Sequence, residues 1–363
     1  MLSYTSAVII ALDASPLTVS TGGVARYTSA LSRALAQSFS ENTYWLVADR
    51  EFPAPENAPP NLRSGERAHS PLQKRWWSIG VSREMTRIGA GLFHGTDFSV
   101  PYLPLRPSVM TVHDLSPWLD PSWQPDSSRV RRRTAALLRA RVPTMIVTPT
   151  EAIRRAVIHR FNWPADRIAA IPLAASEHFR PISCPKPTRP YFVFIGTLEP
   201  RKNIAKLVDA WREVRKTHSV DLILAGRRRD DFPPVEEEPG LQILGAIPDA
   251  DLPSLYSNAL AVVYPSLYEG FGLPVLEAMQ CGALVVTSRD PAISEVAADA
   301  AIRVGDRELP QILASIAAEP AKFADFRGRA LGRALHFSWL RTAELTQEIY
   351  AEADRRFGRK SDA

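Results

Sequence analysis

The chain contains few cysteines and has no long apolar run. Cys184 and Cys281 are the only cysteines among 363 residues, too few and too far apart for a disulfide framework. No group of cysteine and histidine residues has the spacing of a zinc site. We therefore expect no structural metal, no cofactor and a reducing compartment such as the cytoplasm.

The first residues lack both a basic leader and an apolar stretch long enough to span a bilayer. The sequence therefore predicts neither export nor a transmembrane helix. Residues 7–12 instead have the character of a first β-strand.

Positive charge is concentrated in the first half of the chain. The net charge is +5, and residues 1–180 carry 21 Lys and Arg against 14 Asp and Glu, whereas the remaining residues carry 23 against 25. An anionic partner is therefore expected for the first half. Eight of these cations lie in two segments, Lys74-Arg75-Trp76-Trp77 and a cluster formed by Arg129, Arg131, Arg132, Arg133, Arg139 and Arg141.

These basic segments have two interpretations. In one, they rest on an anionic membrane surface with the tryptophans at the headgroup level. In the other, they are an Arg-rich solvated helix and tryptophans of the core. No recognised nucleic-acid motif accompanies the charge, so we expect no nucleic-acid partner.

Short apolar runs alternate with longer segments of helical character, which is typical of parallel sheets with crossover helices. The predicted strands are residues 7–12, 43–48, 91–94, 108–112 and 145–148 in the first half, and 191–196, 221–226, 261–264 and 283–287 in the second. The sequence thus predicts an α/β protein with two parallel sheets. Such sheets bind ligands at the carboxyl ends of their strands.

A proline-rich stretch separates the two sheets. Residues 181–190 contain four prolines, so they suit neither a helix nor an inner strand. We therefore predict an N-terminal domain over residues 1–180, a linker over 181–190 and a C-terminal domain over 191–337. A helix over 338–358 is expected to rejoin the first domain.

Residues 264–288 contain the strongest motif, Tyr-Pro-Ser-Leu-Tyr-Glu-Gly-Phe-Gly-Leu-Pro-Val-Leu-Glu-Ala-Met followed by a further strand. Gly270 and Gly272 permit a tight loop, and Pro274 suits a first helical turn. The free N–H groups of such a helix end bind anionic or hydroxyl-rich ligands. Glu269 and Glu277 flank this site; the alternative is that they are merely a loop charge and a helix charge.

This segment resembles the retaining GT-B glycosyltransferases of family 4, which carry two glutamates separated by seven residues. The resemblance implies two Rossmann-like domains with parallel sheets facing across a cleft. It also implies that Glu269 contacts the transferred sugar, that backbone amides of Phe271, Gly272 and Leu273 reach the same sugar, and that Glu277 holds the nucleotide ribose.

The loop Gly196-Thr-Leu-Glu-Pro-Arg-Lys-Asn203 leads from a strand into a helix near Ile204. In the resembling family this loop supplies an arginine and a lysine that neutralise the donor phosphates. Lys202 matches the lysine. Many members have the arginine directly after the glycine, where this chain has Thr197. Arg201 is therefore expected to make that contact with the donor phosphates. Solvated charges beside a helix start are the alternative.

Two further matches lie in the first half. Gly22 and Gly23 follow the first strand, where family members carry a Gly-Gly loop near the pyrophosphate and the acceptor. His113 follows the strand 108–112, and the resemblance places it beside the transferred sugar as a catalytic residue. The alternatives are that Gly22 and Gly23 only form a turn and that His113 is a structural residue. The role of His94 stays open.

The expected reaction is therefore transfer of a hexose, with retention, from a nucleotide-diphosphate sugar to a glycan or lipid-linked acceptor. The phosphate loop most resembles mannosyltransferases of cell-surface polysaccharide synthesis, so GDP-mannose is the first donor expected. UDP-glucose, UDP-N-acetylglucosamine and a deoxysugar donor stay open. A sugar-nucleotide epimerase and an inactive membrane-associated binding subunit are the other functions considered, and the location expected is the cytoplasm or the inner membrane face.

Overall fold

The computed structural model describes residues 7–18, 22–53, 55, 57–65, 75–183, 185–230, 232–233, 235–236 and 238–361. The chain divides into two compact units. Unit 1 comprises Met1–Leu119, Gln124–Leu173 and Ser338–Ala363, and unit 2 comprises Asp120–Trp123 and Ala174–Phe337. No helix among the described residues is both long and apolar enough to cross a membrane.

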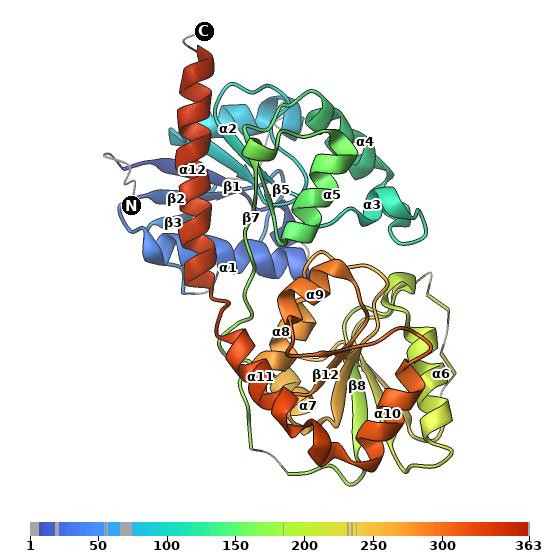
Figure 1. Ribbon diagram of the computed structural model, residues 1–363. Helices are drawn as coiled ribbons and strands as arrows, with labels where there is room; N and C mark the ends of the chain where they lie inside the picture. The colour runs from blue at the N-terminus through green and yellow to red at the C-terminus, as the bar shows by residue number, and fades with distance from the viewer. Residues whose placement is uncertain are drawn as a thin grey trace. The chain divides into compact units, whose positions relative to one another are not determined.

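Unit 1 is built on a parallel sheet with the strand order β3-β2-β1-β4-β5-β6-β7 among the described residues (Figure 1). Its strands are β1 (Ile9–Asp13), β2 (Thr43–Val47), β3 (Leu62–Ser64), β4 (Leu92–Gly95), β5 (Ser108–Thr111), β6 (Met145–Thr148) and β7 (Ile168–Ala170). Its helices are α1 (Gly23–Ser38), α2 (Val81–Ile88), α3 (Ser116–Leu119), α4 (Ser128–Arg139), α5 (Glu151–Phe161) and α12 (Trp339–Ser361).

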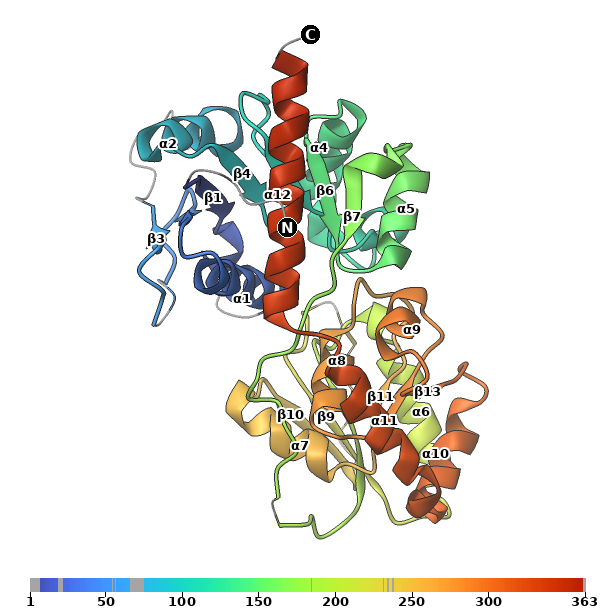
Figure 2. The same cartoon turned by 60° about the vertical axis from the view of Figure 1, so that its left-hand side comes forward.

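The C-terminal helix α12 belongs to unit 1 although it follows unit 2 in sequence. It packs beside α1 and against β5 and β6 (Figure 2). A chain of buried hydrogen bonds joins these elements: the Tyr27 hydroxyl bonds to Thr111 Oγ1 at 2.9 Å, Thr111 Oγ1 to His94 Nε2 at 2.8 Å, and His94 Nδ1 to the Tyr350 hydroxyl at 2.6 Å. His94 is fully buried, so it is a structural residue of unit 1.

Unit 2 contains a second parallel sheet, with the order β10-β9-β8-β11-β12-β13 among the described residues. Its strands are β8 (Tyr191–Ile195), β9 (Asp221–Ala225), β10 (Leu241–Gly245), β11 (Ala261–Tyr264), β12 (Val285–Thr287) and β13 (Ile302–Arg303). Its helices are α6 (Ile204–Val214), α7 (Leu252–Asn258), α8 (Leu273–Gln280), α9 (Pro291–Ala297), α10 (Leu309–Ala318) and α11 (Ala324–Ala334). Both sheets confirm the predicted fold class.

Every strand predicted from the sequence is present, to within about two residues at each end. The strands that the sequence did not predict are β3, β7, β10 and β13, and each lies at an edge of its sheet. Interior strands are buried on both faces and so form apolar runs, whereas an edge strand need not. In β10, for example, exposed residues alternate with buried or half-buried ones, and β13 has only two residues.

The boundary between the units differs from the predicted one. It falls at Leu173 and Ala174, upstream of the proline-rich stretch, so the predicted range 1–180 is too long. The reason lies in the contacts of the intervening residues: Phe179 packs edge-on against Tyr256 at 6.0 Å, and Gln280 donates to the Ser176 carbonyl. Those contacts attach residues 174–180 to unit 2.

The buried histidine makes the stability of the protein depend on pH. Burial lowers the pKa of His94 to about 3, so between that value and about 6.5 the unfolded chain binds a proton that the folded chain excludes. Stability therefore falls as the pH decreases through this window. Going from pH 7 to pH 5.5, we expect His94 to account for a loss of about 1 kcal/mol in the free energy of unfolding, measured by urea titration.

The variant His94→Gln keeps a donor and an acceptor but does not titrate in this range, so it should lack that loss. The control is His159→Gln, because His159 is exposed on α5. A His94→Gln protein with the same pH dependence as the control would contradict the assignment.

Candidate active site

The loop between β11 and α8 has the conformation that its glycines and proline predict. Gly272 lies at φ 88°, a left-handed conformation that favours glycine, and it immediately precedes α8. Pro274 lies in the first turn of the helix. The predicted arrangement of a tight loop leading into a helix N-terminus is therefore confirmed.

Glu269, on this loop, is a buried member of an ion cluster rather than a solvated loop charge. Its side chain is 6% exposed and accepts from Lys202 Nζ at 2.5 Å and from Arg201 Nη1 at 2.8 Å. Burial alone would raise the pKa of Glu269, but Arg201 and Lys202 outweigh it and lower the pKa to about 2. The carboxylate is therefore ionised at any physiological pH.

The two cations come from the loop that follows β8. A short 3₁₀ turn, Pro200–Lys202, places Arg201 and Lys202 side by side, and Asn203 ends it at φ 58°. Lys202 is buried, and its ammonium also donates to the Tyr264 hydroxyl at 2.7 Å. Burial and the neighbouring Arg201 lower the pKa of Lys202, whereas Glu269 opposes the shift. The predicted site residues Glu269, Arg201 and Lys202 thus lie together.

The ion cluster extends to two residues that the sequence analysis did not single out. Arg201 Nη2 lies 2.8 Å from Glu199 Oε1, and Arg229 Nη1 lies 3.1 Å from Glu199 Oε2. Glu199 is in the predicted phosphate loop, and Arg229 follows β9, the strand next to β8. The position of Arg229 at the carboxyl end of a neighbouring strand was a usable signal.

The second glutamate of the motif has a different environment. Glu277 lies within α8, is 2% exposed and accepts from the Tyr256 hydroxyl at 3.0 Å. Phe271 is also buried, with its ring edge-on to Phe337 at 5.9 Å. Leu273 is the first residue of α8. The motif therefore separates an ion-paired carboxylate at its start from a tyrosine-bonded carboxylate eight residues later.

The remaining predicted site residues lie in unit 1. Gly22 precedes α1 at φ 138°, which favours glycine, and Gly23 is the first residue of the helix. His113 follows β5; its Nε2 donates to the Thr96 carbonyl at 2.7 Å, and its ring lies edge-on to Tyr27 of α1 at 5.0 Å. The carboxyl end of β5 and helix α1 therefore meet at His113, while its role in catalysis stays a prediction.

Two carboxylates near His113, the buried Asp13 and the half-buried Asp97, were not predicted. Asp13 ends β1 and accepts from Ser15, and burial raises the pKa of Asp13 to about 7. Burial also raises the pKa of Asp97, while His113 and Arg133 oppose the shift. Asp13 ends β1 and Asp97 follows β4; because these two strands are neighbours, both carboxylates lie at the carboxyl ends of adjacent strands, where such sheets bind ligands.

The two tryptophans of the basic segments lie against other residues of unit 1. Trp76 is 5% exposed, and Trp77 lies edge-on to Phe93 at 6.2 Å with the Arg133 guanidinium over it. Trp76 is therefore a residue of the core and Trp77 is half-buried, while binding of the basic segments to a membrane stays a prediction. Lys74 lies outside the described residues. Most of the clustered arginines lie on α4.

Comparison with known proteins gives two family matches. Residues 21–176 match the family described as "Glycosyltransferase Family 4", and residues 176–306 match the family described as "Glycosyl transferases group 1". The O-antigen chain mannosyltransferase B of Escherichia coli is 36% identical over 285 residues, covering 71% of this chain and 74% of that protein. The O-antigen chain mannosyltransferase RfbU of Salmonella typhimurium is 27% identical over 221 residues, covering 58% of this chain and 59% of that protein.

Solved structures share the fold. Sucrose-phosphate synthase from Thermosynechococcus elongatus superposes with a TM-score of 0.75 at 20% identity, covering 95% of this chain and 98% of that one. Anabaena Alr3699/HepE in complex with UDP-glucose gives 0.72 at 19% identity, covering 95% and 99%.

Removing the charge of Glu269 should release two cations for an anionic ligand. We expect Glu269→Gln to bind inorganic pyrophosphate about tenfold more tightly than the unmodified protein, because one charge-assisted hydrogen bond that competes with the ligand contributes about 1.5–3 kcal/mol. Isothermal titration calorimetry measures this change.

Glu277→Gln is the matched control, since the Glu277 carboxylate bonds to Tyr256 instead of to the cations. Its pyrophosphate affinity should stay within about twofold of the unmodified protein. If both variants have the same affinity, Glu269 does not compete for the cations.

Proposed function

Since the chain belongs to family 4 of the GT-B glycosyltransferases, we propose that it transfers a hexose from a nucleotide-diphosphate sugar to a glycan or lipid-linked acceptor in cell-surface polysaccharide synthesis. The observation that carries this proposal is the cluster of Lys202 and Arg201 around Glu269 beside the N-terminus of α8. It combines two phosphate-binding cations with a carboxylate that suits sugar hydroxyls.

We propose that the donor diphosphate takes the place of Glu269 as partner of the two cations. Lys202 and Arg201 then hold the charge that develops on the leaving nucleotide as the glycosidic bond breaks. Glu269, released from its ion pairs, is free to accept hydrogen bonds from the hydroxyls of the transferred sugar. It orients the sugar and stabilises charge, and no covalent intermediate is assigned to it.

We assign the rest of the donor to the start of α8 and the loop before it. The backbone N–H groups of Phe271, Gly272 and Leu273 are assigned to the sugar, which the exposed N–H groups of a helix start support. Glu277, one turn inside the helix, is assigned to the ribose, where hydroxyls of the nucleotide replace or share its bond to Tyr256. Unit 1 is assigned to the acceptor, but its Gly22 and Gly23 are assigned to the donor pyrophosphate, and His113 is assigned a catalytic role beside the transferred sugar.

Mannose is the first sugar to test, and GDP-mannose the first donor. The relatives named as O-antigen mannosyltransferases support this choice. We also propose that transfer proceeds with retention at the anomeric carbon and takes place at the cytoplasmic face of the membrane.

A donor panel tests the function. Purified protein is incubated with GDP-mannose, UDP-glucose, UDP-N-acetylglucosamine and a deoxysugar nucleotide, with and without lipid-linked glycan acceptors, and release of the nucleoside diphosphate is followed. Acceptor-dependent release is the expected result. Interconversion of sugar nucleotides without acceptor would indicate an epimerase, and the absence of both binding and turnover would indicate a non-catalytic subunit.

Lys202 should be required for handling the donor. Lys202→Ala is expected to weaken donor binding or lower kcat/KM at least tenfold, because a charge-assisted contact to phosphate contributes about 1.5–3 kcal/mol. Lys206→Ala is the control, since Lys206 is exposed on α6 only four residues away in sequence. Steady-state kinetics that are the same for both variants would refute the role of Lys202.

A further inference from the structure

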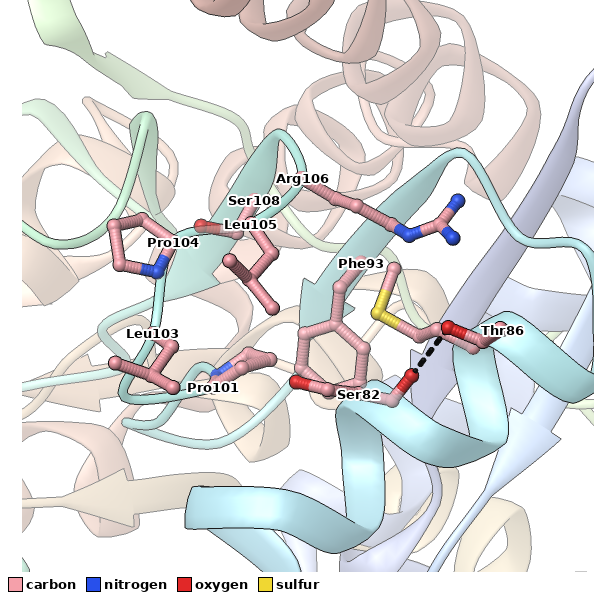
Figure 3. Close-up of a pocket in the computed structure, with 10 residues that line it drawn as sticks. Ser82, Thr86, Phe93, Pro101, Leu103, Pro104, Leu105, Arg106 and Ser108 are labelled. Atoms are coloured by element: carbon pink, nitrogen blue, oxygen red, sulfur yellow. Dashed lines mark hydrogen bonds between the residues drawn. The ribbon is translucent and has the colours of Figure 1, made fainter.

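Side chains that act on the proposed donor site lie at the carboxyl ends of the strands of unit 2. The pocket of about 300 Å³ in unit 1 has a different position, because Ser108, the first residue of β5, and Phe93 of β4 line it (Figure 3). It therefore lies at the amino end of β5. In unit 2, β8, β11 and β12 are adjacent strands, and the loops that follow them meet around Glu269.

Two residues of the loop after β12 hold the loop that carries Glu269. Ser288 Oγ donates to the Ser266 carbonyl at 2.6 Å. Asp290 Oδ2 accepts from the backbone N–H of Glu269 at 3.3 Å, and this bond is buried. Glu269 is thus held in two ways, since the two cations bind its side chain and Asp290 binds its backbone.

Asp290 also caps helix α9. Its Oδ1 accepts from the Ile293 amide at 2.9 Å, which satisfies an N–H group at the start of the helix. A serine would make this cap with its one side-chain oxygen. The cap alone therefore does not require a carboxylate, and the additional oxygen of Asp290 is the one that binds Glu269.

The ionised carboxylate of Asp290 opposes folding. Asp290 is 6% exposed, and burial raises its pKa to about 6; the charge of Glu269 adds to this shift, whereas backbone amides, those of Ile293 and Glu269 among them, oppose it. The folded protein therefore binds a proton that the unfolded chain has lost, and stability falls as the pH rises from about 4 to about 6. A buried group that opposes folding at neutral pH indicates a function beyond capping.

Protonation of Asp290 breaks one of its two bonds. Both oxygens accept from backbone N–H groups, so a proton on either oxygen displaces one of these donors. The bond to Glu269 is the longer one, 3.3 Å against 2.9 Å for Ile293, so we expect it to be lost first. The position of Glu269 is therefore sensitive to the charge of Asp290.

Other charged side chains on the surrounding elements have partners of their own or are exposed. The pairs are Glu277 of α8 with Tyr256, Arg289 with Glu308, Asp306 with Asn203, and Lys202 and Arg201 with Glu269. Glu295, on α9 itself, is exposed. A change in the protonation of Asp290 therefore acts on the site through Glu269.

We propose that Asp290 is a positioning residue that keeps Glu269 at the transferred sugar after the donor diphosphate has taken over its cations. While no donor is bound, the ion pairs and the bond to Asp290 both hold Glu269. Once the cations bind phosphate, the bond to Asp290 still fixes the backbone, so the released carboxylate stays beside the sugar hydroxyls. This inference deepens the proposed function and rests on its assignment of Glu269 to the sugar.

Asp290→Ser tests the bond to Glu269, because serine keeps the cap of α9 but has no second oxygen. With the nucleotide sugar that is active in the donor panel, kcat should fall about fivefold, as loss of one hydrogen bond predicts, while the affinity for the matching nucleoside diphosphate should stay within about twofold. Asp325→Ser, which removes an exposed acid from the first turn of α11, is the control and should change neither quantity.

Thermal unfolding separates positioning from capping. Asp290→Ala loses the cap as well and should have a lower Tm than the unmodified protein, whereas the Tm of Asp290→Ser should stay close to it. An unchanged kcat in Asp290→Ser would overturn the proposal. So would a Tm that falls as far as that of Asp290→Ala, because the role would then be only structural.

The pH profile gives a signature that a structural role would not produce. The ionisation of the substrates and of the other residues is common to both proteins, so the ratio of kcat in the unmodified protein to kcat in Asp290→Ser isolates Asp290. This ratio should be about five above pH 7 and should approach one below pH 5, with a midpoint near the pKa of about 6. A ratio that does not change with pH would contradict the positioning role.

The amide NMR signal of Glu269 tests the bond without any substrate. In the isotope-labelled full chain it should shift with pH around a midpoint near 6, and this shift should be absent from Asp290→Ser. The shift should persist when inorganic pyrophosphate is bound, with Asp290→Ser plus pyrophosphate as the control for the ionisation of pyrophosphate itself. Its disappearance on adding pyrophosphate would overturn the proposal. A shift that persists beside an inactive donor panel would instead refute the proposed function, so the two failures are distinguishable.

Discussion

The buried ion pairs of Glu269 with Lys202 and Arg201 are the constraint on which the geometry of unit 2 depends. Removing charges from water is costly, so pairing stabilises the buried charges of Glu269 and Lys202, two residues that are each 6% exposed. Loss of one partner of such a pair typically costs about 3–5 kcal/mol. The loops after β8 and β11 are therefore held together by their charges, and the Leu267 amide donating to the Arg201 carbonyl at 2.8 Å adds a backbone link.

In unit 1, the hydrogen bonds that join α1, β4, β5 and α12 in the interior involve no charged groups. Its buried polar chain through Tyr27, Thr111, His94 and Tyr350 consists of neutral groups, and burial keeps the imidazole uncharged by lowering its pKa. Even the carboxylate of Asp13 has a pKa raised by burial to about 7. One unit is thus stabilised at its sheet by neutral hydrogen bonds, and the other concentrates fixed charge where an anionic donor is expected.

The sequence predicted what is local and missed what depends on distant neighbours. Interior strands and the Gly272 turn were predictable because burial on both faces and a left-handed φ each restrict residue choice at a single position. The salt bridge between Glu199 and Arg229 joins residues 30 apart in sequence, and it depends on β8 and β9 being neighbours in the sheet. Packing also decides the exposure of two residues whose character predicts otherwise. Trp76 is buried and Leu103 is exposed, and composition does not encode either outcome.

At the proposed donor site, the ion cluster also requires the diphosphate to bind before Glu269 can contact the sugar. While no phosphate is present, Glu269 is occupied by Lys202 and Arg201, so its carboxylate is not available to sugar hydroxyls. A diphosphate gives the cations a new anionic partner, and the hydroxyls of the attached sugar donate hydrogen bonds to the displaced carboxylate, whereas a free sugar offers the cations no such replacement. On the proposed assignment, recognition of the sugar through Glu269 is coupled to the presence of the diphosphate, and we expect an intact nucleotide sugar to bind more tightly than either of its halves.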